Sequence, residues 1–265
     1  MPDELLVGAA EVDITPPVGV SLAGSLEPRP STGTDDPLMA KAVVLESRGA
    51  QIAYVLLDLI ALSRQEGDRA VQLAAAATAI PAEHIVWAAS HTHTGPYTMF
   101  FLGADKKDVD GAWLERVPER VADAVATAWE SRRPAKLSRL RGYCNRVSHN
   151  RRLRFKDGRE INTWLLHSGE AEVQCLGAAG PIDPELGVLC FDNAGGTPIA
   201  VLWHFTLHTN TNCGPRFSAD YPAVVAARLR EHFGSGVVCI FAPGPVRIST
   251  VPGRATAKWE IAWPT

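Results

Sequence analysis

The chain has 265 residues, with 26 Lys and Arg against 29 Asp and Glu, so its formal net charge at pH 7 is −3. Hydrophobic residues make up 46% and charged residues 21%, which is close to an average globular domain and excludes long disorder and collagen-like repeats. The net negative charge also excludes a nucleic-acid-binding protein that works by bulk positive charge. The five cysteines form no C-x-x-C pair, which predicts reduced thiols and not a disulfide framework or a zinc ribbon.

The sequence contains no pattern typical of a targeting or membrane-spanning segment. Residues Met1–Val7 include two acids and lack the basic and apolar regions of a signal peptide. The longest apolar stretch, Ile52–Leu62, is interrupted by Asp58 and is far shorter than a bilayer span. These features predict a soluble cytoplasmic protein; the alternative is a secreted protein whose leader was removed.

Short apolar runs rich in β-branched residues alternate with helical patterns along the chain. The predicted strands are Ala42–Glu46, Ile52–Leu57, His84–Ala89, Ile161–Leu166, Gly187–Phe191, Ile199–Trp203 and Val237–Phe241. The predicted helices are Arg64–Ile80, Trp113–Trp129 and Asp220–Phe233. The Asn193-Ala-Gly-Gly segment between two strands predicts a hairpin turn.

The order of these elements indicates the fold class. The strand–helix–strand order from Ala42 to Ala89 favours a mixed α/β fold, and the later hairpin adds antiparallel pairing. The sequence shows no internal repeat and no low-complexity linker. We therefore expect an α/β protein, with a mixed β-sheet core flanked by helices, in a single domain.

The segment Ser90-His-Thr-His-Thr-Gly-Pro96 directly follows a predicted strand. Side chains two residues apart on extended backbone point to the same side, so His91 and His93 can face one site. Ligand sites of α/β folds lie at such strand ends, and neutral imidazole is a common zinc ligand. The alternative is that both histidines are hydrogen-bonded loop residues.

A second candidate ligand, His208, also follows a predicted strand. His204 lies four residues earlier, and we interpret it as a histidine of the sheet core or edge. Asp220 is the first residue of a predicted helix, and its position favours a helix cap over a catalytic base.

Two further charged positions have alternative interpretations. Asp58 interrupts an apolar strand, and a buried carboxylate needs a partner, so we interpret it as a hydrogen-bonded anchor and, second, as a site residue. Arg151, in Asn150-Arg-Arg152, belongs either to a solvated basic face or to a guanidinium group that orients a substrate carbonyl or anion.

Several segments together resemble the neutral/alkaline (non-lysosomal) ceramidase family. Two of them are Ser90–Pro96, similar to the family signature T-H-T-H-S-G-P, and Phe205–Thr209, similar to F-x-x-H-P. The others are Val7–Pro17, Asp36–Leu45, Leu57–Leu59, Asn150–Arg152 and Ser218–Pro222. Their order and rough spacing extend the resemblance from Val7 to about Gly244.

The resemblance implies a zinc-dependent amidase that hydrolyses an N-acyl bond such as that of ceramide. It implies His91 and His208 as zinc ligands, His93 beside the substrate carbonyl, and Arg151 as a residue that holds the substrate. Zinc would act as Lewis acid and water activator, while His93 and Arg151 would stabilise the oxyanion. The implied partner is a small N-acyl compound, either ceramide or a soluble analogue; the sequence indicates no oligomeric state.

The sequence departs from the family after its last predicted strand. The G-D-[IV]-[NS]-P motif and the downstream Glu and Tyr ligands have no counterpart, although a catalytic zinc normally has three protein ligands. We therefore expect a truncated family-like domain over residues 1–244 and a tail over 245–265, produced by a shift of reading frame. The alternative to a frameshift is a divergent short homologue with a genuine loop. The alternative to an active enzyme is an inactive remnant.

Other enzyme classes fit the sequence poorly. The chain has neither the length nor the eight βα repeats of an amidohydrolase barrel. It has no phosphate-binding G-x-x-x-x-G-K, no dinucleotide-binding G-x-G-x-x-G and no serine-hydrolase G-x-S-x-G.

Overall fold

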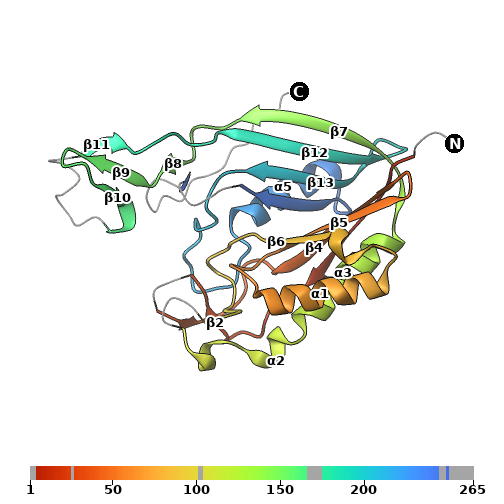
Figure 1. The fold of residues 1–265 in the computed structure, drawn as a ribbon, viewed down its shortest axis with the longest axis horizontal. Coiled ribbons are helices and arrows are strands. Elements are labelled where there is room, and N and C mark those ends of the chain that lie inside the picture. Colours follow the sequence, from red (N-terminus) through yellow and green to blue (C-terminus); the bar gives the residue numbers. More distant parts are fainter. Residues whose placement is uncertain (1–3, 25–26, 101–103, 166–174, 245–248, 251–265) are drawn as a thin grey trace.

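The computed structural model describes residues 4–24, 27–100, 104–165, 175–244 and 249–250. Its main feature is an eight-stranded sheet with the strand order β14-β13-β12-β7-β1-β4-β5-β6 (Figure 1). The strands are β1 (Leu6–Asp13), β4 (Met39–Ser47), β5 (Ala50–Leu57), β6 (Ile85–Ala89), β7 (Arg133–Tyr143), β12 (Glu185–Asn193), β13 (Pro198–Phe205) and β14 (Val238–Pro243). The pairs β5–β6 and β13–β14 are parallel and the other pairs are antiparallel, so the predicted mixed sheet is confirmed.

Shorter strands form three small sheets beside the main one. They are β2 (Ser21–Leu22), β3 (Arg29–Pro30), β8 (His149–Asn150), β9 (Arg152–Phe155), β10 (Glu160–Asn162), β11 (Cys175–Ala178) and β15 (Ser249–Thr250). The sheet β10-β9-β11 extends away from the main sheet, on the left in Figure 1. Single-turn 3₁₀ helices span Ala82–His84, Lys106–Asp108 and Thr163–Leu165.

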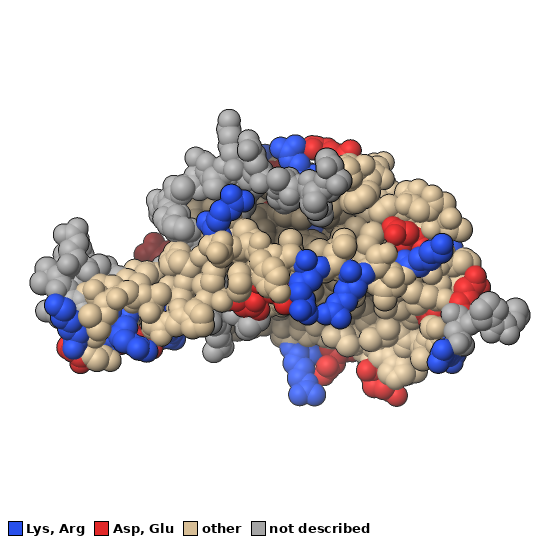
Figure 2. Space-filling view, turned by 90° about the horizontal axis from the view of Figure 1, so that it is seen from above, with Lys and Arg blue, Asp and Glu red and all other residues tan. Residues whose placement is uncertain are grey.

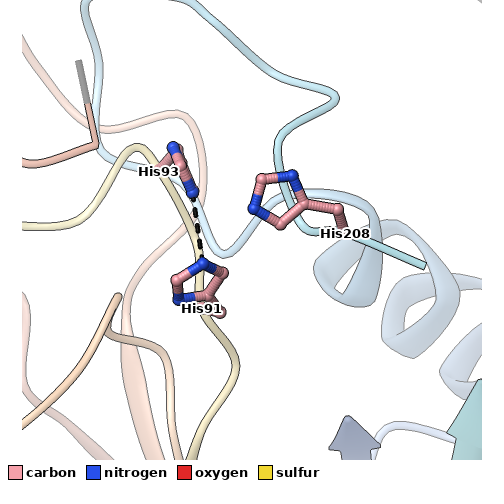
Figure 3. Close-up of side chains that lie close together, drawn as sticks. All are labelled: His91, His93 and His208. Carbon is pink, nitrogen blue, oxygen red and sulfur yellow. Dashed lines mark hydrogen bonds between the residues drawn. The ribbon is translucent and has the colours of Figure 1, made fainter. Parts of the chain in front are cut away.

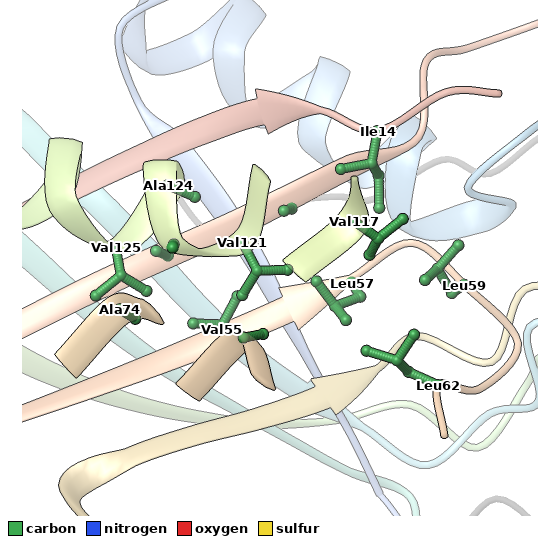
Figure 4. Close-up of a cluster of buried hydrophobic side chains, with 14 of the residues drawn as sticks. Ile14, Val55, Leu57, Leu59, Leu62, Ala74, Val117, Val121, Ala124 and Val125 are labelled. Carbon is green, nitrogen blue, oxygen red and sulfur yellow. The ribbon is translucent and has the colours of Figure 1, made fainter. Parts of the chain in front are cut away.

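Two longer helices cover one face of the main sheet. They are α1 (Arg64–Ala77) and α3 (Val117–Glu130), which the short helix α2 (Gly111–Leu114) precedes. The Ser63 hydroxyl accepts a hydrogen bond from the Glu66 amide and so caps α1. Val121 and Val125 of α3 lie four residues apart, and both are buried against strand residues such as Val55 (Figure 4).

The opposite face of the sheet packs against α5 (Tyr221–Phe233). Tyr221, Ala226 and Leu229 of this helix join a second apolar cluster with residues of β12, β13 and β14. Alternate residues of β4 belong to the two clusters, because successive strand side chains point to opposite faces. Both layers therefore share one sheet, and the predicted single α/β domain is confirmed.

Some predicted elements need correction. The helix predicted over Trp113–Trp129 is two helices, because Pro118 lies in the first turn of α3 and ends the pattern begun by α2. The strand predicted over Ile161–Leu166 is only the end of β10 followed by a 3₁₀ turn, and Leu166 lies outside the described residues. The strands β1, β7, β9 and β11 were not predicted.

Other expectations are confirmed or stay predictions. The hairpin turn is present, with the Gly196 amide donating to the Asn193 carbonyl at 3.0 Å. Most of the predicted tail over residues 245–265 lies outside the described residues, so the boundary at Gly244 stays a prediction. None of the helices described is long and apolar enough to cross a membrane. The face in Figure 2 carries acidic and basic side chains scattered among uncharged ones.

Candidate metal centre

Three histidines from two distant loops meet near the ends of β6 and β13. His91 and His93 lie in the loop after β6, and His208 lies in the loop after β13. Their ring centroids are 5.0 Å apart for His91 and His93, 5.1 Å for His91 and His208, and 4.6 Å for His93 and His208. One ring nitrogen from each lies within 4.8 Å of the other two (Figure 3). The arrangement can hold a metal ion.

Two backbone carbonyls fix the orientation of His91 and His93. Nδ1 of His91 is 2.9 Å from the Ile60 carbonyl oxygen, and Nδ1 of His93 is 2.8 Å from the Gly24 carbonyl oxygen. A carbonyl oxygen only accepts, so each Nδ1 carries a proton, and in the neutral form of either ring the lone pair lies on Nε2. Such carbonyl contacts are the usual outer partners of metal-binding imidazoles.

The two Nε2 atoms lie 3.4 Å apart (Figure 3). Two neutral rings with their protons on Nδ1 offer no proton to share between these atoms, whereas a cation beside them would satisfy both lone pairs. Two imidazole nitrogens on a tetrahedral zinc are about 3.3 Å apart, given zinc–nitrogen bonds of about 2.0 Å. The separation of the two Nε2 atoms is therefore close to that of two nitrogens beside one cation, and the ring nitrogens of all three histidines lie within 4.8 Å of one another.

Burial keeps two of these histidines uncharged. Burial is the largest cause that lowers the pKa of His93 from 6.5 to about 4 and the pKa of His208 from 6.5 to about 3. The Arg151 cation also lowers both pKa values, so its charge lies close enough to act on the cluster. Both rings are neutral at pH 7, which is the form that binds a metal ion.

Backbone contacts join the two histidine loops. The His93 amide donates to the Thr209 carbonyl at 3.2 Å, and the Thr209 hydroxyl donates to the Ser90 carbonyl at 2.7 Å. His91 has a φ of 66°, in the left-handed region that non-glycine residues rarely adopt. Strain of this kind persists only where the surroundings fix it, and it clusters at functional sites.

The backbone carbonyl of Ser218 holds the loop that carries His91 and His93. The Thr92 and Thr94 hydroxyls donate to the Ser218 carbonyl at 2.7 and 3.0 Å. The Ser218 hydroxyl donates to Asp36 at 2.7 Å. Burial is the main cause that raises the pKa of Asp36, while its hydrogen bond from Ser218 acts in the opposite direction.

Asp220 supports the second loop. Its carboxylate accepts hydrogen bonds from the Thr211 amide and hydroxyl, from the Asn212 amide, and from the Tyr221 amide at the start of α5. The interpretation of Asp220 as a helix cap is confirmed, and the structure adds its second role in the loop after His208.

The other sequence candidates lie outside the cluster. His204 is a half-buried residue of β13 whose Nδ1 is 3.0 Å from the Ala242 carbonyl oxygen, as its interpretation as a sheet histidine predicts. Asp58 pairs with Lys41, so the interpretation of Asp58 as an anchor is confirmed. Arg151 is half-buried between β8 and β9, and its charge acts on the cluster as described above.

Sequence reasoning missed the groups that orient the rings. Gly24 is one, with a φ of 96° and a backbone so close to His93 that a Cβ would lie 2.6 Å from the ring. In the sequence, Gly24 is one loop glycine among many, and nothing links it to His93, which lies 69 positions away. Among the residues that the structure describes, no Asp, Glu or Cys joins the three histidines as a further ligand.

The fold and the site define an α/β protein with a candidate three-histidine metal centre at the end of its sheet. Neutral ceramidase from Pseudomonas aeruginosa is similar in structure, with a TM-score of 0.73 and 22% identity over 95% of this chain and 40% of that chain. A second structure, described as ceramidase complexed with C2, gives a TM-score of 0.72 and 22% identity over 94% of this chain and 39% of that chain. No protein-family model and no curated protein matches the sequence.

These similarities establish a ceramidase-like fold for this chain. The chain spans about two fifths of the length of the two solved ceramidases. At 22% identity the likeness concerns the fold alone, so the activity has to be argued from the site.

Proposed function

We propose that the chain forms the zinc-binding part of a ceramidase-like hydrolase that cleaves N-acyl amide bonds. His91 and His208 bind the zinc ion, and His93 and Arg151 act on the substrate. The observation that carries the proposal is the convergence of three imidazoles from two loops, which brings one ring nitrogen each of His91, His93 and His208 within 4.8 Å of one another.

The donor set fits zinc. Imidazole nitrogen is a preferred zinc ligand, and the Nδ1 proton of His91, held by the Ile60 carbonyl, leaves its Nε2 lone pair available to the metal. Zinc, when bound, supplies a Lewis acid that polarises the amide carbonyl and lowers the pKa of water.

The protein's own side chains supply the remaining chemistry. Because the Nδ1 proton of His93 is held by the Gly24 carbonyl, only Nε2 can accept a proton from the attacking water. The resulting imidazolium can then donate from Nε2 to the oxyanion or to the leaving amine. The Arg151 guanidinium, whose charge acts on His93 and His208, stabilises the negative oxygen as the carbonyl carbon becomes tetrahedral.

The substrate class is a small N-acyl amide, either ceramide or a soluble analogue. The second candidate is an inactive remnant of such an enzyme, which keeps the fold, binds substrate or metal poorly and has no catalytic activity. One observation favours this alternative: the described part of the chain brings three histidines together and adds no carboxylate ligand to them. We also propose that the domain ends near Gly244 and that the frame shifts there; the coding DNA downstream of that codon tests this directly.

Zinc content and amide hydrolysis, measured on the same preparations, test the proposal. Wild type is expected to bind one zinc ion per chain and to release fatty acid from a short-chain ceramide or an N-acyl amino acid. His91→Ala is expected to lose both properties. His93→Ala is expected to keep zinc and lose turnover, because His93 acts on the substrate and is not needed as a ligand.

His204→Ala is the matched control, since His204 lies on β13 outside the cluster. It should retain both zinc and turnover. Wild-type protein that binds no stoichiometric zinc and hydrolyses no amide would favour the remnant and refute the enzyme. Hydrolysis that persists in His91→Ala would refute both candidates.

A further inference from the structure

Lys41 and Asp58 form a buried ion pair between β4 and the segment after β5, near the loop that carries His91. Asp58 is fully buried and Lys41 is 4% exposed, and Oδ2 of Asp58 is 3.0 Å from Nζ of Lys41. The same Oδ2 accepts a hydrogen bond from the Met39 amide at 3.1 Å. Lys41 and Met39 belong to β4, and Asp58 directly follows β5. The pair therefore ties the end of β5 to β4.

The residues after Asp58 hold His91 directly. The Asp58 amide donates to the Met39 carbonyl at 3.0 Å, so its backbone and its side chain are both fixed to β4. The Leu59 carbonyl accepts the His91 amide at 2.9 Å, and the Ile60 carbonyl accepts Nδ1 of His91 at 2.9 Å. Both hydrogen bonds that orient His91 thus come from the two residues after Asp58.

Stability alone does not account for this ion pair. Removing two charges from water is costly, and apolar replacements of similar volume for a buried ion pair are often neutral or stabilising. Leu56 and Leu57 beside Asp58 are fully buried, and the charges of Asp58 and Lys41 both act on the pKa of the nearby Asp36 carboxyl, so three charged groups meet in a buried region. A role in geometry explains the pair better, since His91 adopts an unfavourable φ of 66° that has to be imposed by its surroundings.

We propose that Asp58, held by Lys41, is a positioning residue that fixes the turn at Leu59 and Ile60 and thereby aims Nε2 of His91 at the metal. This inference rests on the proposed function for the role of the metal. Outer partners of metal-binding histidines typically change metal affinity by 10–100-fold. Asp58 acts one step further out, through the carbonyls that contact the ring.

Two double variants test the inference. Asp58→Leu/Lys41→Met removes both charges and the acceptor of the Met39 amide, while Asp58→Asn/Lys41→Met removes both charges and keeps an acceptor oxygen. The first is expected to bind zinc about 10-fold more weakly, the lower end of the range for direct partners, because Asp58 acts one step further out. In the metal-free protein, its His91 amide is also expected to exchange hydrogen at least ~10-fold faster, because the bond to Leu59 loosens. Asp58→Asn/Lys41→Met is expected to retain most of the wild-type zinc affinity and most of the wild-type protection of the His91 amide from exchange.

A matched control is the half-buried pair of Arg132 and Glu46, at the far end of β4 from Met39. Arg132→Met/Glu46→Leu should leave zinc affinity and His91 exchange unchanged. If Asp58→Leu/Lys41→Met does not fold, Asp58→Ala/Lys41→Met replaces it in the same comparison. Wild-type zinc affinity and wild-type His91 exchange in the folded Leu or Ala variant would overturn the inference. Wild-type protein that binds no zinc would refute the proposed function, and the exchange comparison would still decide the role of Asp58.

Discussion

The substitution Gly24→Ala tests the orientation of His93 most sharply. Gly24 has a φ of 96°, and a Cβ built on it would lie 2.6 Å from Cγ and Nδ1 of His93. An ordinary van der Waals contact begins at 3.4 Å, so the ring or the Gly24 backbone has to move by several tenths of an ångström. That movement breaks the hydrogen bond from Nδ1 to the Gly24 carbonyl, which is 2.8 Å long in the wild-type protein.

The expected cost has two parts. The left-handed backbone conformation costs an alanine about 1–2 kcal/mol. Loss of the hydrogen bond and displacement of the ring add about 1–2 kcal/mol. Gly24→Ala should therefore lower the free energy of unfolding by about 2–4 kcal/mol.

Urea unfolding of the metal-free protein at pH 7.5 measures this change. Gly19→Ala is the matched control, because Gly19 has a φ of 100° and a Cβ there meets nothing within 4 Å. The control should lose only the backbone part, about 1–2 kcal/mol. In a His93→Ala background, the loss of unfolding free energy caused by Gly24→Ala should be no larger than the loss caused by Gly19→Ala. Equal destabilisation by Gly24→Ala and Gly19→Ala in the wild-type background would refute the contact.

Two further predictions concern pH and Asp220. Burial holds the pKa of His93 in the folded protein at about 4, below its value of 6.5 in the unfolded chain. As the pH falls, the unfolded chain therefore binds a proton at His93 before the folded protein does, which favours unfolding. Relative to His93→Gln, the metal-free wild type should lose about 3 kcal/mol of stability as the pH falls from 7.5 to 4, and parallel stability curves would contradict this. Asp220→Ala leaves four hydrogen-bond donors of the His208 loop and α5 unpaired and should cost about 3–5 kcal/mol in urea unfolding. Asp220→Asn should cost clearly less, and equal costs would count against the network.

The strand ends that carry the site could be predicted from the sequence. The apolar run before His208 is the largely buried strand β13, and the run before His91 is the partly buried edge strand β6; apolar runs of this kind are recognisable in a sequence. β6 and β13 each pair in parallel with a neighbouring strand. Ligand sites of α/β sheets lie at the carboxyl ends of such strands, and the loops that carry the three histidines follow those ends.

Other strands have no comparable signal. β7 is exposed over most of its length, and its sequence Arg133–Tyr143 mixes cations with single leucines, so neither alternation nor an apolar run marks it. β1 contains Gly8, which weakens a strand pattern. A Cβ at Gly8 would lie 1.9 Å from the Ala128 carbonyl oxygen, so the glycine is needed where α3 approaches the strand.

The groups that orient the site could not be predicted, because their contacts join residues far apart in the chain. Gly24 meets His93 across 69 positions, and Ile60 meets His91 across 31. These contacts are made by backbone carbonyls. Every residue has one, so the identity of a residue does not show that its carbonyl orients a histidine ring. The carboxylates of Asp36 and Asp220 were visible as residues, but their donors depend on how the loops fold.

Zinc K-edge X-ray absorption of the zinc-loaded protein tests the central proposal most directly. Metal binding by His91 and His208 predicts imidazole scattering from at least two nitrogens at about 2.0 Å, lost in His91→Ala and in His208→Ala but retained in His204→Ala. Sulfur scattering at about 2.3 Å, or an imidazole signal that survives both substitutions, would place the metal elsewhere and contradict the proposal.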